Sequence, residues 1–377
     1  MPAQASAEPS EQPRRTPFLV YRDQIGAPSE IEFLRRQYIG FTRLEPSWIG
    51  RVLLPQAGCV GERRLRLGGP GLSGSLRRLL FRHWQVVPPI DLPLLAPVLH
   101  AQFARGGALA LPLARSLGSR LVVTLHGGDI GKEKNWHGTM LARRWPEVVD
   151  QAGAIVCVST AVAEIALRRS VPQAKLVVLP IGVEVPAQMP PPPAALSYHL
   201  FVGRFVEKKG VSVLADAIRI LRAAGDGTRL VCVGDGHQRP VLEAVARELP
   251  GVELTGWLPQ SEVQRLMASA SSMLVPSIVA PDGDTEGLPS VVPEAMAQGC
   301  PVIGSAEGGI AEAVRNGVSG LLVPPGDPAS LAGAMAQMTE QPELRNRLGQ
   351  GAFAEVTRRL NARAQSAALE DLLLRFC

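Results

Sequence analysis

Two glutamates eight positions apart, Glu286 and Glu294, flank the sequence Gly-Leu-Pro-Ser-Val-Val-Pro. The Gly and Pro residues predict a turn, and Ser290 is a residue type that caps helix N-termini. Glu286 would then lie on the loop and Glu294 on the first helical turn, beside the backbone N–H groups of residues 287–291. Backbone N–H groups that can donate to a phosphate, next to two carboxylates that can accept from hydroxyl groups, suit a nucleotide-sugar pocket. The alternative is that the two glutamates only stabilise the positive end of the helix dipole.

Two cations follow an apolar run at 200–203, which is typical of a buried strand. Arg204 comes directly after this run, and Lys209 precedes Gly210 and a helix-period segment. Arginine binds a phosphate through its planar fork and lysine as a mobile point charge. We expect both to contact a diphosphate, the alternative being surface charges on a strand-to-helix loop.

Glycines stand where further strands should end. Gly308 and Gly309 precede a predicted helix, and their backbone amides can approach a phosphate closely. Gly234, after the run at 230–233, could lie at the edge of a nucleobase.

A histidine ends a strand-like run in the first half of the chain, in the sequence Leu-His-Gly-Gly-Asp. The imidazole of His126 can donate or accept a hydrogen bond near neutral pH. Asp129 could orient this histidine or stabilise the loop. His137, on the following loop, is expected to be a bystander.

Apolar runs alternate with helix-period segments along the whole chain of 377 residues, which predicts βαβ units and parallel sheets covered on both faces. Runs at 18–21, 51–54, 98–101 and 121–124 are predicted strands, and 29–41 and 74–83 are predicted helices. The proline-rich stretch around 190–193 can hold neither a helix nor an interior strand. We therefore expect a disordered leader at 1–16, a first domain at 17–180, a linker at 181–196, a second domain at 197–358 and a C-terminal helix at 359–377 that packs back on the first domain.

Charge is unevenly distributed between the halves. The net charge of +5 divides into +9 up to Pro190, from 23 Lys and Arg against 14 Asp and Glu, and −4 after it. The densest basic cluster comprises Arg63, Arg64, Arg66, Arg77, Arg78 and Arg82. An anionic membrane surface or a lipid diphosphate fits this cluster, a solvated face is the alternative, and nucleic acid is excluded because no aromatic–basic interleaving accompanies it. Without an apolar span or signal-peptide core, the chain reads as cytoplasmic, peripheral at most at a membrane.

Taken in order, the motifs resemble those of glycosyltransferase family 4, the retaining GT-B enzymes. The resemblance covers residues 201–335 and rests on Gly-Arg-Phe with a downstream Lys-Gly, Val-Gly-Asp-Gly, Gly-Trp-Leu-Pro, the paired glutamates and Gly-Gly-Ile. In the first half, His-Gly-Gly-Asp is similar to a family motif, whereas the acceptor-side segment 21–29 has one glycine where members often carry a glycine-rich loop. The resemblance implies two doubly wound Rossmann-like α/β domains that face each other across a cleft.

The resemblance also implies roles for single residues. Glu286 would lie at the donor sugar, Glu294 at the nucleotide ribose and His126 near the reacting carbon, while Trp257 and Leu258 would flank the base. The expected catalytic residues are His126, Arg204, Lys209 and Glu286. The expected donor-binding residues are Gly203, Arg204, Lys209, Gly234, Trp257, Leu258, Glu286, Gly287, Leu288, Pro289, Glu294, Gly308 and Gly309.

The implied reaction moves a sugar from a UDP- or GDP-sugar to an acceptor hydroxyl with retention, in exopolysaccharide, lipopolysaccharide or capsule assembly. The implied acceptor is a lipid-linked saccharide. No cofactor or metal is expected: Asp282 and Asp284 spell the D-x-D of metal-dependent GT-A transferases, but they lie just before Glu286 rather than after a first-half strand. The five cysteines include no C-x-x-C pair typical of zinc sites. Alternatives are a non-hydrolysing sugar-nucleotide epimerase and a non-catalytic sugar-nucleotide-binding scaffold.

Overall fold

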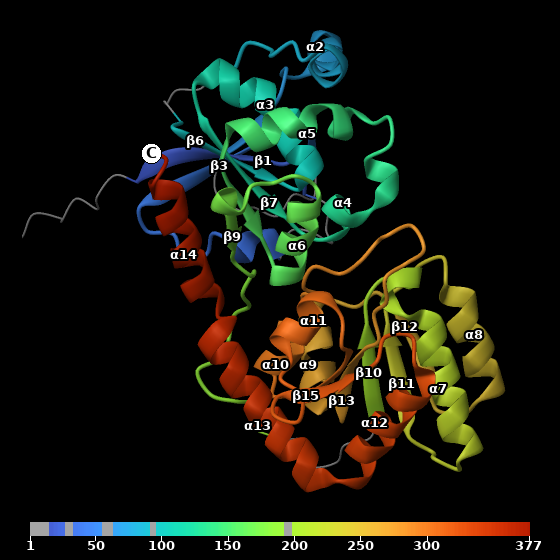
Figure 1. Ribbon diagram of the computed structural model, residues 1–377. Coiled ribbons are helices and arrows are strands. Elements are labelled where there is room, and N and C mark those ends of the chain that lie inside the picture. Colours follow the sequence, from blue (N-terminus) through green and yellow to red (C-terminus); the bar gives the residue numbers. More distant parts are fainter. Residues whose placement is uncertain (1–14, 27–32, 55–62, 91–95, 192–197) are drawn as a thin grey trace, which may run out of the picture.

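Two parallel α/β domains make up the protein, seen in a computed structural model that describes residues 15–26, 33–54, 63–90, 96–191 and 198–377. Figure 1 shows one sheet in each domain with helices packed on its faces, and the two domains next to each other. The predicted fold class is therefore confirmed. Most of the expected leader and the end of the expected linker lie outside the described residues.

The N-terminal sheet has seven parallel strands in the order β5-β3-β1-β6-β7-β8-β9. The strands are β1 (Thr16–Tyr21), β3 (Leu44–Gly50), β5 (Arg63–Arg66), β6 (Val98–Gln102), β7 (Arg120–Leu125), β8 (Ala152–Cys157) and β9 (Leu176–Val178), and β2 (Gln24–Ile25) pairs separately with β4 (Val52–Leu53). The helices are α2 (Gly71–Trp84), α3 (Ala104–Leu117), α4 (Gly128–Gly131), α5 (Met140–Gln151) and α6 (Thr160–Arg168), with short 3-10 turns η1 (Glu133–Asn135) and η2 (Gln173–Lys175).

The C-terminal sheet has six parallel strands in the order β12-β11-β10-β13-β14-β15. The strands are β10 (Tyr198–Val202), β11 (Arg229–Val233), β12 (Val252–Gly256), β13 (Ser272–Val275), β14 (Val302–Ser305) and β15 (Gly320–Val323). The helices are α7 (Val211–Ala223), α8 (Arg239–Glu248), α9 (Gln260–Ser269), α10 (Val291–Ala297), α11 (Gly308–Ala313), α12 (Pro328–Glu340), α13 (Pro342–Arg359) and α14 (Ala362–Leu374), and η3 (Glu207–Lys209) is a 3-10 turn.

In both sheets the strand order reverses beside the first strand, between β1 and β6 and between β10 and β13. In each sheet, the connections that leave the two strands at the reversal run in opposite directions. This opens a crevice at the carboxyl edge of the sheet, where ligands of such folds bind. The architecture therefore directs the two crevices of the domains toward their common boundary.

One predicted strand was wrong. The prediction placed a strand at 51–54, but the sheet strand is β3 (Leu44–Gly50), and residues 52–53 form only the short β4. Strand β3 contains Pro46, which lacks an N–H group and is unfavourable inside a sheet. It is tolerated because β3 pairs with the edge strand β5 only from Ser47 onward, so no ladder bond on that side is lost.

The last helix, α14, returns to the N-terminal domain (Figure 1). Its Leu369, Leu372 and Leu373 pack in the same cluster as Phe18 and Val20 of β1. Glu370 accepts hydrogen bonds from the backbone N–H groups of Thr42, Arg43 and Leu44 at 2.9, 2.7 and 2.7 Å. The chain thus crosses the domain boundary twice, once in the linker and once before α14, and Val183 of the linker pairs with Leu360 and Ala362 at the second crossing.

Candidate active site

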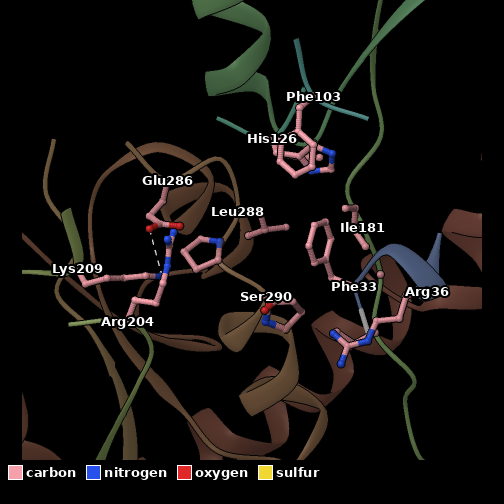
Figure 2. A pocket seen from close by; sticks show the side chains of 15 residues that line it. Phe33, Arg36, Phe103, His126, Ile181, Arg204, Lys209, Glu286, Leu288 and Ser290 are labelled. Atoms are coloured by element: carbon pink, nitrogen blue, oxygen red, sulfur yellow. Dashed lines mark ion pairs between the residues drawn. The ribbon is translucent and has the colours of Figure 1, made fainter. Parts of the chain in front are cut away.

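A cavity of about 310 Å³ lies between the two domains and draws its walls from both. His126 follows β7, Arg204 follows β10, Lys209 ends η3, and Glu286 lies on the loop after β13. Figure 2 shows Arg204, Lys209 and Glu286 on one side of the pocket and Phe33, Arg36 and Ile181 on the other. The complete lining is Phe33, Arg36, Phe103, His126, Val158, Ile181, Gly182, Val183, Arg204, Lys209, Glu286, Leu288, Pro289, Ser290 and Pro293.

The C-terminal side of the pocket is built at the strand-order reversal. Arg204 follows β10 and Glu286 lies on the loop after its neighbour β13, so adjacent central strands carry the cation and the carboxylate into one crevice. The structure therefore brings together His126, Arg204, Lys209 and Glu286, the four side chains expected to be catalytic.

Glu286 is a buried carboxylate held by two lysines. Its Oε1 lies 3.2 Å from Lys209 Nζ and 3.3 Å from Lys208 Nζ. Burial alone would raise the pKa of Glu286, but the two ammonium groups outweigh it and lower the pKa, so the carboxylate is ionised at neutral pH. Oε1 nevertheless has no aligned hydrogen-bond donor in the described structure. Glu286 lines the cavity, and an ionised carboxylate has several acceptor positions, so it is suited to bind a ligand hydroxyl.

His126 is neutral and fixed in orientation. Burial, with smaller contributions from Arg22 and His100, lowers the pKa of His126 to about 3. Its Nε2 lies 2.9 Å from Gln102 Oε1, so Nε2 carries the proton and donates it to the amide oxygen. Phe103 packs against the imidazole with ring centroids 4.2 Å apart.

The tautomer of His126 is set by a buried chain of polar groups. Gln102 Nε2 donates to the Tyr38 hydroxyl at 2.7 Å, and this hydroxyl donates to Nδ1 of His100 at 2.8 Å. His100 then donates from Nε2 to Thr124 Oγ1 at 2.7 Å, with its pKa lowered to about 3 by burial. With these proton positions each group of the network has a hydrogen-bond partner, and the amide oxygen of Gln102 stays directed at His126.

Asp129 stabilises the loop and does not touch the imidazole. Its carboxylate accepts from the backbone N–H of His126 at 2.9 Å and of Ala104 at 2.8 Å. Of the two roles left open by the sequence, the geometry supports the loop role. His137 is exposed and lies outside the pocket lining, 3.0 Å from the carbonyl oxygen of Glu133.

The two domains touch through backbone beside the pocket. Gly127 and Glu286 form an antiparallel bridge, and a Cβ at Gly287 would lie 2.3 Å from the carbonyl oxygen of His126. A Cβ at Gly309 would lie 1.8 Å from the carbonyl oxygen of Gly287. No larger residue fits either position, so these glycines permit the close approach that puts His126 beside Glu286.

Glu294 lies just outside the lining and is already engaged. Its Oε1 lies 2.6 Å from Arg36 Nη1, across the domain boundary, and its Oε2 accepts from Gln260 at 3.4 Å. Ser290 occupies the N-cap position of α10, but its side chain makes no capping hydrogen bond and its residue lines the pocket instead.

The remaining expected donor-binding residues fall into two groups. Gly203 and Gly234 pack behind the lining, against Lys209 and against each other. Gly308 lines a second cavity, which has Glu286 in common with the pocket. Leu258 lines a third cavity together with Glu262, and Trp257 is 59% exposed. The structure does not bring Trp257 or Leu258 to the pocket that holds Arg204.

The D-x-D carboxylates form ion pairs with lysines. Asp284 lies 2.7 Å from Lys132 of the N-terminal domain and 3.1 Å from Lys208, and Asp282 lies 3.2 Å from Lys134. This pairing joins the domains and uses the oxygen atoms that a cation would need. Within the described ranges, no group of three or more His, Cys, Asp or Glu side chains is arranged to hold a metal ion.

Sequence reasoning missed several residues that shape the site. Gln102 and His100 are wholly buried polar residues inside the apolar strand β6. Two polar residues in an otherwise apolar strand are visible in the sequence and could have indicated a buried polar site. Phe103 has a φ of +69°, which is unusual for a residue other than glycine, but no sequence pattern announces it. Phe33 and Arg36 come from a segment remote in sequence, and Lys208 was overlooked beside Lys209.

Two family models match the chain. The model described as "Glycosyl transferases group 1" matches residues 197–341, and "Glycosyl transferase 4-like domain" matches residues 42–182. Together they span both crevices of the pocket.

Curated relatives and a solved structure agree with these matches. The chain is 30% identical over 256 residues to an amylovoran biosynthesis glycosyltransferase, AmsK, of Erwinia amylovora, covering 66% of this chain and 62% of that protein. It is 32% identical over 262 residues to a putative colanic acid biosynthesis glycosyltransferase, WcaL, of Escherichia coli, covering 67% and 63%. The matches therefore span less than two thirds of these relatives. The structure of Anabaena Alr3699/HepE in complex with UDP superposes with a TM-score of 0.76 at 18% identity, covering 95% of this chain and 100% of that one, which shows a common fold.

Proposed function

The chain belongs to glycosyltransferase family 4, with the GT-B fold, and from this premise we propose that it transfers a sugar from a nucleoside diphosphate sugar to an acceptor hydroxyl. The observation that carries the proposal is the cavity in which Arg204, Lys209 and Glu286 of one domain face His126 of the other. Two cations match a diphosphate, and the ionised carboxylate of Glu286, which lines the cavity, matches a sugar hydroxyl. HepE, which shares the fold, was solved with UDP, in agreement with such a donor.

We propose that the transfer retains the configuration of the anomeric carbon. The bond between that carbon and the diphosphate oxygen breaks, the acceptor oxygen bonds on the same face, and the departing diphosphate takes the acceptor's proton. Arg204 and Lys209 stabilise the charge that develops on the diphosphate. Glu286 is paired with Lys208 and Lys209, so it is better suited to orient the sugar than to attack it.

We propose that no metal ion takes part. The positive charge at the diphosphate would come from Arg204 and Lys209, while Asp282 and Asp284 are engaged by lysines. Full activity in excess EDTA is the expected result, and a complete loss that is restored by a divalent cation would contradict this part of the proposal.

We further propose that the acceptor is a lipid-linked saccharide at the cytosolic face of a membrane. AmsK and WcaL carry names from polysaccharide biosynthesis, and the basic cluster from Arg63 to Arg82 lies in the acceptor-side domain. Among the described residues, no helix is long and apolar enough to cross a bilayer.

The test incubates the full chain with a panel of UDP- and GDP-sugars and a lipid-linked acceptor, and measures released nucleoside diphosphate and the anomeric configuration of the product by NMR. Release of the diphosphate with a retained anomer is expected. Conversion of the donor without release would indicate an epimerase, and saturable binding without turnover a scaffold; either would contradict the proposal.

A further inference from the structure

Helix α2 (Gly71–Trp84) presents a leucine stripe to solvent. Leu72, Leu76 and Leu79 are 91%, 57% and 48% exposed, and their spacing places them on one face of the helix. Trp84, the last residue of α2, and Val86 just after it are also exposed, at 66% and 52%. Scattered apolar side chains are normal on a surface, but three exposed leucines on one face of a helix are typical of an interaction site.

The opposite face of α2 is anchored to the domain. Gly74 and Phe81 are buried, and Phe81 belongs to the same apolar cluster as Leu67 and Leu99. Arg78 donates to the carbonyl oxygen of Gly69 at 2.6 Å. The helix is therefore held in place with its leucines outward, and folding of the domain does not require the stripe to be covered.

Arginines lie close to the stripe in sequence. Between residues 63 and 90 the sequence holds six arginines and no Asp or Glu. Arg77 and Arg82 are exposed on α2, and Arg63 and Arg66 are exposed on the edge strand β5. Within the described part of the chain, none of these four forms an ion pair. Figure 1 shows α2 at the end of the N-terminal domain that lies away from the C-terminal domain.

We propose that α2 docks the protein on an anionic bilayer, with Leu72, Leu76, Leu79 and Trp84 inserted at the boundary between head groups and acyl chains and the arginines paired with lipid phosphates. A leucine face bordered by arginines is the arrangement that such an interfacial helix requires. A second copy of the chain is the weaker occupant, because symmetric pairing of α2 would bring the exposed Arg77 and Arg82 of both copies together. The inference adds insertion to the charge attraction proposed above, and it does not depend on the transferase activity.

The test measures sedimentation of the full chain with vesicles, either of phosphatidylcholine alone or of equal parts phosphatidylcholine and phosphatidylglycerol. Binding is expected to the anionic vesicles and to be weak on the neutral ones. Brominated acyl chains should quench the fluorescence of Trp84, measured as the difference between the wild type and Trp84→Phe. Quenching of Trp84 is the signature of insertion, because a protein adsorbed by charge alone keeps its indole outside the acyl region.

Two sets of substitutions separate the apolar and the charged contributions. The triple variant Leu72→Ser, Leu76→Ser and Leu79→Ser should lose at least about 100-fold of its partitioning into anionic vesicles, even at low salt. The double variant Arg77→Gln and Arg82→Gln should bind more weakly and with less salt dependence. The matched control Leu167→Ser, Ile220→Ser and Val318→Ser removes exposed apolar side chains elsewhere and should bind like the wild type.

Several outcomes would overturn the inference: no vesicle binding, binding unchanged in the leucine triple variant, absence of Trp84 quenching, or a wild-type dimer in solution that the leucine substitutions dissociate. Release of nucleoside diphosphate with a water-soluble acceptor is measured in parallel. If vesicle binding fails and release persists, the docking inference fails alone; if release is absent and binding persists, the proposed function fails alone.

Discussion

The two halves of the pocket are built in different ways. The C-terminal half places Arg204, Lys209 and Glu286 on loops that follow adjacent strands, and these residues act through their own charges. The N-terminal half contributes His126, which is neutral and held by a chain of buried polar groups that runs through β6 to Tyr38. The net charge is +9 up to Pro190 and −4 after it, so the positive charge for a diphosphate in the C-terminal half comes from a few local cations.

This contrast explains where sequence motifs succeed. A charged loop site is compact in sequence, because the strand and the helix that position it are its neighbours. A site built from buried hydrogen bonds draws on residues that are distant in sequence, such as Tyr38 and Thr124, and leaves no local motif.

The largest expected effect lies in the C-terminal half. Arg204→Ala and Lys209→Ala should each lower kcat by about 10²–10³, because each removes a donor to the charge on the leaving diphosphate. The measurement is the initial rate of nucleoside diphosphate release. Arg265→Ala, at a side chain that is 76% exposed, is the matched control and should retain full activity. Rates within a few fold of the wild type for both site variants would contradict the assignment.

The next effect tests the buried chain of the N-terminal half. Gln102→Leu should lower kcat/KM about 10- to 100-fold, because His126 Nε2–H loses its buried acceptor. Gln102→Glu keeps an acceptor and recovers much of the rate. Its carboxylate favours the imidazolium, so the pKa of His126 rises and activity is lost at a higher pH than in the wild type as the solution is acidified. A merely structural role for Gln102 predicts a rate loss with no shift of the pH profile.

Acid should destabilise the N-terminal half more than the C-terminal half. Burial lowers the pKa of His100 and His126 to about 3 and that of His199 to about 4. The unfolded chain binds these protons near pH 6.5 and the folded chain does not, so stability is present above pH 6.5 and is lost as the pH falls toward the folded values. Each histidine should cost about 1.4 kcal/mol per pH unit in that window.

The measurement is urea unfolding from about pH 7.5 to about pH 5.5, which brackets the ordinary histidine pKa of about 6.5, together with hydrogen exchange to separate the halves. Exchange should accelerate first around β6 and β7, which carry His100 and His126. A flat stability profile, or earlier opening around β10, would count against this reading.

The smallest effect concerns the ion pairs that join the domains. The double variant Lys132→Ala and Lys134→Ala removes the cross-boundary partners of Asp284 and Asp282. Because these pairs are partly exposed, each contributes about 0.2–1 kcal/mol, and the donor KM should rise about two- to fivefold with kcat nearly unchanged. Arg247→Ala on α8 is the control for loss of a surface cation. An unchanged KM would show that the backbone contacts at Gly127 and Gly287 suffice for closure.

The sequence predicted the fold class and central strands of both sheets, because buried parallel strands are continuous apolar runs. It failed at β3, where Pro46 and the polar Ser47 interrupt that pattern, and the pairing that tolerates them is visible only in the sheet. The convergence of Arg204, Lys209, Glu286 and His126 followed from motifs at strand ends. The pairing of Glu294 with Arg36 could not be foreseen, because the two residues come from different domains and meet only when these close.

The most direct test of the shared pocket is a crystal structure of the full chain with a bound nucleoside diphosphate sugar. The account predicts the diphosphate between Arg204 and Lys209, and the sugar between Glu286 and His126. A nucleotide in the cavity beside Leu258 and Glu262, or one that leaves Arg204 and Lys209 without contact, would contradict it.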